Sequence, residues 1–289
     1  MRLFVPRPLC LLVLLIASGG FSFAQTARLP EPASYGSKIS VRPDLAYGEA
    51  GHQIFDLYLP AGSDRPKVVI CWFGGAFWGG DKSHMGGVCA YLAAHGFAAL
   101  APGYALGAKD GSVSVWPQAV YDAKAAVRHV RANERSLQVD ASRVAALGYS
   151  SGAYLAMMVG VTPNLTELEG PGVVLPGASR VSAVIAMAGV YDRRRDLGLP
   201  LALLGAGYEE KPDLRIAASP IIYVNPRTVP IYVLHGQDDD VADVSSATQL
   251  SAALRENRVP HELHLVAAKH YPITVEQLGG MVGWLRKVL

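Results

Sequence analysis

The sequence predicts a single α/β domain with a mostly parallel central sheet that is covered by helices on both faces. Short, continuously apolar runs alternate along the chain with longer segments whose apolar residues recur at the helical period. Runs of this kind are typical of parallel strands, because such strands are buried on both faces. The chain has 289 residues, of which 51% are hydrophobic, and this is enough for one deep core.

The first 24 residues have the features of an export signal. Two arginines precede a short apolar run over residues 9–17, and Ser22-Phe23-Ala24 forms a small-x-small cleavage site. The apolar run is too short to span a bilayer, and a retained N-terminal anchor is the alternative interpretation. We therefore expect residues 1–24 to be removed and residues 25–289 to form an exported, periplasmic or secreted domain without stable membrane insertion.

Composition argues against several classes of partner. Loss of Arg2 and Arg7 with the signal would reduce the 26 basic residues to 24, equal to the 24 acidic residues. A formally neutral chain lacks the basic surface that nucleic-acid binding needs. The sequence also shows no metal-ligand spacing and no Gly-x-Gly-x-x-Gly after the first strand, so we expect neither a metal nor a dinucleotide cofactor. It gives no indication of the oligomeric state.

Two cysteines remain after the signal, and an oxidising compartment would allow them to pair. Cys71 lies in the middle of a predicted strand, and Cys89 lies on the apolar face of a predicted helix. These positions favour two buried thiols over a disulfide.

The predicted elements follow an extended, proline-rich segment that ends at Pro43. Alternation of polar and apolar residues predicts a half-buried first strand, and apolar runs predict buried strands at 67–73 and 181–188. Residues 189–229, rich in glycine, proline and charge, predict a lid-like insertion over the sheet edge. In chain order, the predicted strands are 52–60, 67–73, 98–102, the run before Gly148, 181–188, 230–235 and 261–266, and the predicted helices are 86–95, 116–135, the segment after Gly152, 243–257 and 272–289.

The stretch Val144–Met158 predicts a strand, a sharp turn and a helix. Its turn is the Gly-x-Ser-x-Gly pentapeptide Gly148-Tyr149-Ser150-Ser151-Gly152. In this context the motif is a nucleophile elbow, in which the serine backbone is strained and its Oγ is exposed above the sheet. Glycine is needed on both sides of the serine because the chain reverses so tightly.

A serine hydroxyl becomes a nucleophile when a base takes its proton and an acid orients that base. After Ser150, one predicted strand ends in three acids, Asp238, Asp239 and Asp240, and the next strand is followed by His270. The order serine, acid, histidine is the one this kind of fold uses. His235 at the end of a strand is expected to pack or hydrogen-bond locally.

A glycine-rich loop follows the strand over 67–73. Gly74-Gly75-Ala76-Phe77-Trp78-Gly79-Gly80 has four glycines at the C-terminal end of a buried strand. Its backbone N–H groups could hold a negatively charged oxygen, and an ordinary glycine turn is the alternative interpretation.

Together these motifs resemble those of the α/β-hydrolase family, and specifically carboxylesterases of the hormone-sensitive-lipase and feruloyl/acetyl-esterase (BD-FAE-like) type. The resemblance covers most of residues 25–289 and implies an α/β-hydrolase catalytic domain. It implies that Ser150 is the nucleophile and His270 the general base. The family's His-Gly-x-x-Asp pattern falls on His235 to Asp239, which makes Asp239 the acid, with Asp238 and Asp240 as alternatives.

The resemblance also implies an oxyanion hole formed by the backbone N–H groups of Ser151, Gly75 and Ala76. The sequence departs from the family at Phe73, where a histidine usually opens the loop, and at Ala76, where a third glycine is common. Because the donors are backbone groups, neither change removes them. Phe77, Trp78 and Tyr149 are expected to line an acyl or alcohol pocket, and simple packing of loop aromatics is the alternative interpretation.

The sequence therefore predicts a cofactor-independent serine carboxylesterase that acts on small or short-chain esters through an acyl-enzyme. Export favours acetyl or feruloyl esters on carbohydrate. The alternatives are an exported peptidase or amidase of the same fold and, from another class, a binding protein on an inactive hydrolase scaffold. Presence of both Ser150 and His270 argues against the latter.

Overall fold

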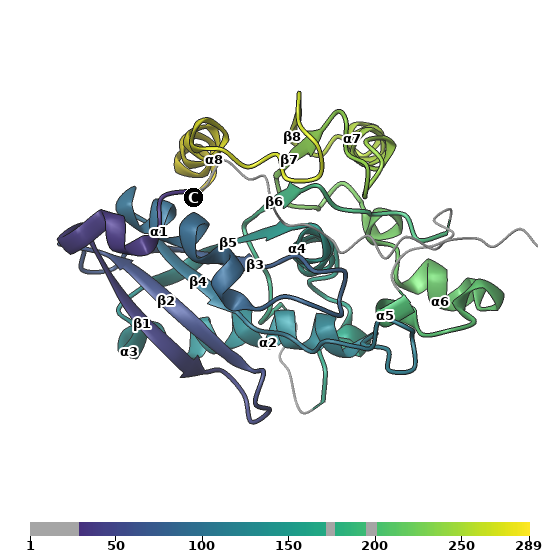
Figure 1. Ribbon diagram of the computed structural model, residues 1–289, viewed down its shortest axis with the longest axis horizontal. Coiled ribbons are helices and arrows are strands. Elements are labelled where there is room, and N and C mark those ends of the chain that lie inside the picture. The colour runs from purple at the N-terminus through teal and green to yellow at the C-terminus, as the bar shows by residue number, and fades with distance from the viewer. Residues whose placement is uncertain (1–28, 172–176, 195–200) are drawn as a thin grey trace, which may run out of the picture.

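Eight strands form one sheet at the centre of the computed structural model, which describes residues 29–171, 177–194 and 201–289 (Figure 1). The strand order is β1-β2-β4-β3-β5-β6-β7-β8, and only the pairs made by β2 are antiparallel. The predicted signal over 1–24 lies outside the described residues. The strands are β1 Ile39–Ala46, β2 Ile54–Pro60, β3 Lys67–Trp72, β4 Ala98–Pro102, β5 Asp140–Tyr149, β6 Ala183–Met187, β7 Ile231–Gly236 and β8 His261–Val266.

Strands β3, β4, β6 and β7 are buried as their apolar runs predict, whereas β2, predicted as half-buried, has all but its two end residues buried. Every residue of β4, β6 and β7 is buried, as parallel strands covered on both faces require. The edge strand β1 was not predicted as a strand, because the sequence there suggested only an extended segment. It has no buried residue and contains Pro43, and an edge strand tolerates the missing N–H of proline because its open side needs no pairing.

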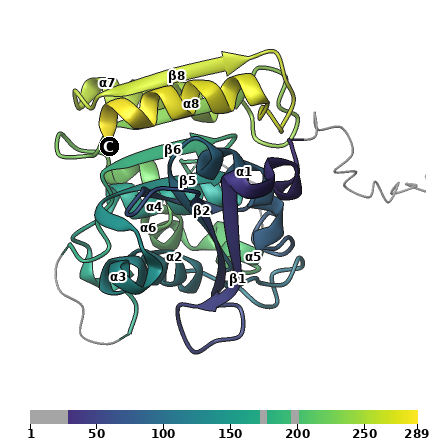
Figure 2. The same cartoon turned by 90° about the vertical axis from the view of Figure 1, so that its left-hand side faces the viewer.

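Helices cover both faces of the sheet (Figure 2). Helices α1 and α8 contact each other, and α2 packs on α4. The helix predicted over 116–135 spans Gln118–Ala132 in the structure and is followed by a separate short helix. None of the described helices is long and apolar enough to cross a membrane. The helices are α1 Gly86–Ala94, α2 Gln118–Ala132, α3 Glu134–Leu137, α4 Ser151–Val161, α5 Leu201–Leu204, α6 Pro212–Ala217, α7 Ser245–Glu256 and α8 Val275–Val288.

The predicted insertion over 189–229 is partly described and contains the short helices α5 and α6 (Figure 1). The N–H groups of Val115 and Trp116 donate to the carbonyl oxygens of Ala202 and Leu203, so this segment is joined to the loop before α2. It therefore packs on the main domain. Cys71 and Cys89 are both buried and unpaired, in agreement with the expectation of two thiols.

The parallel pairing of β3, β5, β6, β7 and β8 places the carboxyl ends of these strands along one edge of the sheet. Ligand sites of open α/β sheets form at this edge. The glycine-rich loop follows β3, Ser150 follows β5, the three acids follow β7, and His270 follows β8. The topology therefore brings together loops that are far apart in the sequence.

Candidate active site

Ser150 lies in the sharp turn between β5 and α4. Its backbone has φ 55° and ψ −118°, a conformation that is strained for a residue other than glycine. Its N–H donates to the carbonyl oxygen of Met187 in β6 at 2.8 Å. A Cβ atom on Gly148 or Gly152 would lie 2.0 Å from a backbone oxygen, so the turn needs glycine at both positions. This is the strand-turn-helix geometry that the sequence predicts.

The strain at position 150 predicts that glycine there stabilises the fold. Glycine adopts a positive φ without a Cβ clash, whereas alanine does not. We expect the free energy of unfolding of Ser150→Gly to exceed that of Ser150→Ala by about 1 kcal/mol. Urea denaturation of the two variants measures this difference, and equal stabilities would show that the turn stores no strain.

The side chains of His270 and Asp239 lie next to Ser150. His270 Nε2 is 3.0 Å from Ser150 Oγ, and His270 Nδ1 is 3.0 and 2.9 Å from the two carboxylate oxygens of Asp239. An imidazole that carries its proton on Nδ1 donates to the carboxylate and leaves Nε2 to accept from the serine. The three side chains thus form a continuous hydrogen-bonded chain from carboxylate to hydroxyl.

The structure distinguishes among the three consecutive acids. The Asp239 side chain is fully buried against His270. Asp240 instead pairs with Lys269 at 2.9 Å on the surface, where both side chains are more than half exposed. Asp238 is exposed, and its N–H donates to the Ala268 carbonyl oxygen. Asp239 is therefore the acid that contacts the histidine.

Four donors surround the Asp239 carboxylate. The N–H groups of Val241 and Ala242 lie 2.9 and 2.8 Å from Oδ1, and Nε2 of the buried His235 lies 3.1 Å from Oδ2. His270 is the fourth donor. Burial alone would raise the pKa of Asp239, but the hydrogen bonds from His235, His270 and the Ala242 amide lower it well below its ordinary value. The carboxylate is thus held ionised and in one orientation.

The contact of His235 with the acid is more specific than the local packing that the sequence suggested. His235 Nε2 also lies 2.7 Å from the carbonyl oxygen of Ala242, so its proton bridges the carboxylate and the turn that follows. In the sequence, the only indication of this contact is that His235 ends a strand and lies four residues before Asp239.

A small cavity of about 40 Å³ adjoins Ser150 and His270. Ala76 and Ser151 line it. Ser151 is the first residue of α4, so its N–H has no acceptor within the helix. Gly75, which does not belong to the lining, accepts with its carbonyl oxygen from the N–H groups of Trp78 and Gly79 and thereby closes the loop. This arrangement favours Ala76 over Gly75 as the loop residue that faces the serine.

Tyr104, which follows β4, bridges the glycine-rich loop and the start of α4 through its hydroxyl. No sequence motif predicted this role. Its buried hydroxyl donates to the Phe73 carbonyl oxygen at 2.8 Å and lies 3.2 Å from Ser151 Oγ. The rings of Tyr104 and Phe73 stack with centroids 4.3 Å apart. Burial raises the pKa of Tyr104, so the hydroxyl stays protonated. Tyr104 thus fixes the loop at Phe73, the residue that opens it.

The segment that holds Tyr104 is itself fixed. The buried carboxylate of Asp122 accepts the N–H of Ala105 at 2.8 Å, and the hydroxyl of Tyr47 donates to the Gly103 carbonyl oxygen at 2.6 Å. Bonds on both sides of residue 104 therefore limit its movement.

Removal of the Tyr104 hydroxyl is expected to weaken stabilisation of the oxyanion. Tyr104→Phe should lower kcat about tenfold and change KM less, because the loop amides become misplaced by a fraction of an ångström. Steady-state kinetics with p-nitrophenyl acetate measures both constants. The matched control is Tyr121→Phe, which also removes a hydroxyl bound to a carbonyl oxygen, that of Glu167. An equal loss of kcat in the control would contradict the assigned role.

The three residues expected to line the substrate pocket occupy different positions. Phe77 is buried and lines the cavity beside Ser150. Tyr149 is outside the lining and packs against the ring of His270, with centroids 5.3 Å apart. Trp78 is also outside the lining and is 36% exposed, with the ammonium of Lys109 5.0 Å from its ring centre. Within the described residues, Phe77 therefore contacts the acyl cavity, and Tyr149 supports the histidine.

Comparison with known proteins identifies similar chains. Residues 55–254 match the BD-FAE family. The chain is 32% identical to Esterase LipQ of Mycobacterium tuberculosis over 49% of this chain and 35% of LipQ. It is 28% identical to the probable carboxylic ester hydrolase LipM of the same organism over 74% of this chain and 51% of LipM. The chain thus spans about half the length of these relatives or less.

Among solved structures, a truncated carbohydrate esterase from gut microbiota superposes with a TM-score of 0.78 at 22% identity. The superposition covers 87% of this chain and 97% of that one. Agreement over nearly the whole length of both chains shows that the two share the α/β-hydrolase fold.

Proposed function

Because the chain belongs to the BD-FAE family, we propose that it is a serine carboxylesterase that hydrolyses short-chain carboxylic esters. The observation that supports this function most directly is the hydrogen-bonded chain from Asp239 through His270 to Ser150. A chain of this kind generates a nucleophile without a metal or an organic cofactor.

The geometry supports an acyl-enzyme mechanism. Ser150 Oγ attacks the ester carbonyl carbon while His270 Nε2 takes its proton, and Asp239 stabilises the resulting imidazolium. The N–H groups of Ser151 and Ala76 hold the oxyanion of the tetrahedral intermediate. His270 then gives the proton to the leaving alcohol. A water molecule, deprotonated by the same histidine, releases the acid and restores Ser150.

The size of the cavity supports a small acyl group. A volume of about 40 Å³ is small compared with typical ligand pockets and suits a short acyl group such as acetyl. A feruloyl group is much larger and would extend beyond this cavity. We therefore favour acetyl over feruloyl esters. Trp78, on the same loop as Ala76, is partly exposed and lies outside the acyl cavity, so a contact with substrate would be on the alcohol side.

A series of p-nitrophenyl esters tests this proposal. We expect purified protein to hydrolyse the acetate with the highest kcat/KM and each longer acyl chain less well, because extra methylene groups overfill the cavity. Acetate release from acetylated xylan, measured with an acetate assay, tests carbohydrate as the alcohol. A preference for longer chains would contradict the assigned acyl cavity. Hydrolysis of p-nitroanilides without hydrolysis of esters would favour the peptidase or amidase alternative.

We also propose that the protein is exported, on the basis of the predicted signal in residues 1–24. Acetylated polysaccharides would then be accessible to it outside the cytoplasm. Intact-mass analysis of the protein recovered from the periplasm or medium is expected to show an N-terminus at Gln25. A full-length chain in the cytoplasm would contradict this localisation.

A further inference from the structure

A second pocket lies at the edge of the sheet opposite to Ser150. It has a volume of about 370 Å³ and lies between the end of α4, the residue Arg180 before β6, and the turn that precedes β7. Strands β6 and β7 begin at this edge, whereas Ser150, Asp239 and His270 follow the opposite ends of their strands. A ligand bound in this second pocket would therefore not contact Ser150.

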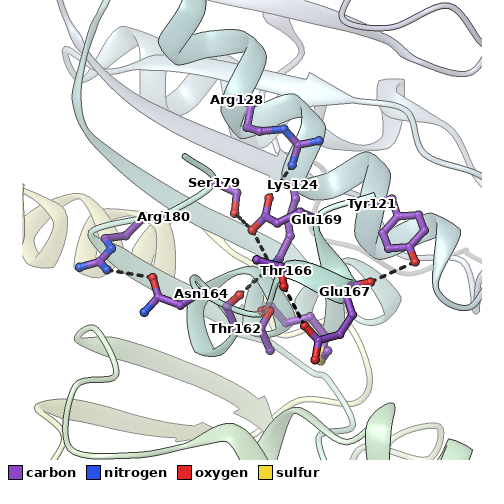
Figure 3. A network of polar contacts seen from close by, with 11 residues as sticks. Tyr121, Lys124, Arg128, Thr162, Asn164, Thr166, Glu167, Glu169, Ser179 and Arg180 are labelled. Carbon is purple, nitrogen blue, oxygen red and sulfur yellow. Dashed lines mark hydrogen bonds and ion pairs between the residues drawn. The ribbon is translucent and has the colours of Figure 1, made fainter. Parts of the chain in front are cut away.

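The pocket is positively charged. Arg180 and Arg227 are its charged lining residues, and none of the residues that line it in the described part of the chain is acidic. Both arginines are exposed and so are accessible to a ligand. Nη2 of Arg180 donates to Asn164 Oδ1 at 3.3 Å, which holds the guanidinium along the pocket wall (Figure 3). Two arginines without a lining acid form an anion site.

Buried Glu169 is compensated by other cations, whereas exposed Glu167, close enough to Tyr223 to act on it electrostatically, lies outside the lining. Buried Glu169 pairs with Lys124 at 2.9 Å and Arg128 at 2.6 Å (Figure 3). Lys124 Nζ also donates to the carbonyl oxygen of Thr162 at 2.6 Å, at the C-terminal end of α4. A helix C-terminus has a partial negative charge that would repel an anion, and the ammonium offsets it. Glu169 therefore does not neutralise the two arginines.

The remaining lining groups suit a sugar. Tyr223 contributes an aromatic side chain, and its hydroxyl is held by the Ala217 carbonyl oxygen at 2.9 Å. Asn164 adds an amide group, and Asn225 fixes the wall, because its side chain donates to the Tyr223 carbonyl oxygen at 2.8 Å and accepts from the Arg227 N–H at 2.9 Å. Aromatic rings together with amides and a few charged groups are typical of small-molecule sites, and the volume is in their range.

From this lining we propose that the pocket binds a uronic-acid residue of an acidic polysaccharide. The sugar carboxylate lies between Arg180 and Arg227, because guanidinium and carboxylate groups form strong paired hydrogen bonds. Tyr223 and Asn164 contact the sugar ring and its hydroxyls. This second site would hold the protein on a polysaccharide, separately from the acyl specificity of the catalytic cavity.

Affinity electrophoresis in native gels that contain polygalacturonate tests this site. We expect the polysaccharide to retard the wild-type protein, and neutral xylan not to. The double variant Arg180→Gln/Arg227→Gln should bind at least about tenfold more weakly, because each arginine contributes a charge-assisted hydrogen bond. The matched control is Lys38→Gln/Arg42→Gln, which also removes two positive charges but at the far edge of the sheet, from exposed Lys38 and half-buried Arg42.

The outcomes separate specific binding from charge alone. Equal retardation of the two double variants, or equal retardation of the wild type in xylan, would overturn the proposal. Titration calorimetry with galacturonate and with sulfate at the same ionic strength distinguishes a sugar from a small anion. Equal affinity for both would overturn the sugar assignment. Thermal unfolding confirms that the variants are folded, and unchanged hydrolysis of p-nitrophenyl acetate shows that the effect does not come from the catalytic site.

Discussion

Ser150→Ala is expected to lower kcat for p-nitrophenyl acetate by about a millionfold, because it removes the atom that attacks the carbonyl carbon. The rest of the site remains, so the variant should still bind substrate with a similar KM. The neighbouring hydroxyl of Ser151 does not replace it, since its Oγ lies 3.2 Å from the Tyr104 hydroxyl and its side chain is buried. Burst-phase and steady-state kinetics measure the loss.

Ser151→Ala is the matched control for this prediction. It removes the adjacent hydroxyl but keeps the backbone N–H of residue 151, so most of kcat should remain. A phosphonate ester that reacts with activated serines should add its mass to the peptide that contains Ser150 in the control protein and not in Ser150→Ala. Activity that survives in Ser150→Ala and is lost in Ser151→Ala would show that the nucleophile has been assigned to the wrong serine.

Much of the fold could be predicted because buried strands and helices leave a recognisable pattern of apolar residues in the sequence. The central strands are continuous apolar runs, and the structure buries them completely at β4, β6 and β7. Strand β1 gave no such signal, since none of its residues is buried and it contains Pro43. An edge strand of this kind is defined by its pairing with β2, and a pairing partner cannot be identified from local composition.

Prediction of the site succeeded where chain order was sufficient. The order of the strands placed Ser150, the acids and His270 at one edge of the sheet. It could not choose among Asp238, Asp239 and Asp240, because consecutive residues in a turn differ in side-chain direction rather than in spacing. Tyr104 was missed for a related reason: its contacts with Phe73 and Ser151 join segments 31 and 47 residues away, and nothing in the local sequence records them.

Asp239→Asn is expected to lower kcat about ten-thousandfold while the fold is retained. An amide that turns its NH₂ group toward His270 Nδ1 would donate to that atom and place the imidazole proton on Nε2. The histidine could then no longer accept the proton of Ser150. An amide in the opposite orientation would direct its NH₂ group toward the donors that the carboxylate now satisfies, among them the N–H groups of Val241 and Ala242. In neither orientation does asparagine make all the hydrogen bonds that the carboxylate makes.

Asp240→Asn is the matched control, because it makes the same chemical change at the next residue. The Asp240 side chain is exposed and pairs with Lys269, so this variant should keep wild-type kcat. If Asp240→Asn lost as much activity as Asp239→Asn, a general effect of charge on the loop would explain the data better than a specific role for Asp239.

The lowered pKa of Asp239 also predicts how its contribution to stability depends on pH. A carboxyl group whose pKa is lower in the folded than in the unfolded state stabilises the fold at pH values above its unfolded pKa, about 3.9 for aspartate. This contribution is lost as the pH falls through the folded pKa, which lies well below that value. Asparagine at position 239 has no such dependence. The difference in free energy of unfolding between wild type and Asp239→Asn, measured by urea denaturation, should therefore be constant from pH 7 to about pH 5 and decrease toward pH 2. A difference that stays constant over the whole range would mean that the four donors around the carboxylate do not favour its charged form. In that case the orientation of His270 would have to come from packing against Tyr149 rather than from an ionised acid.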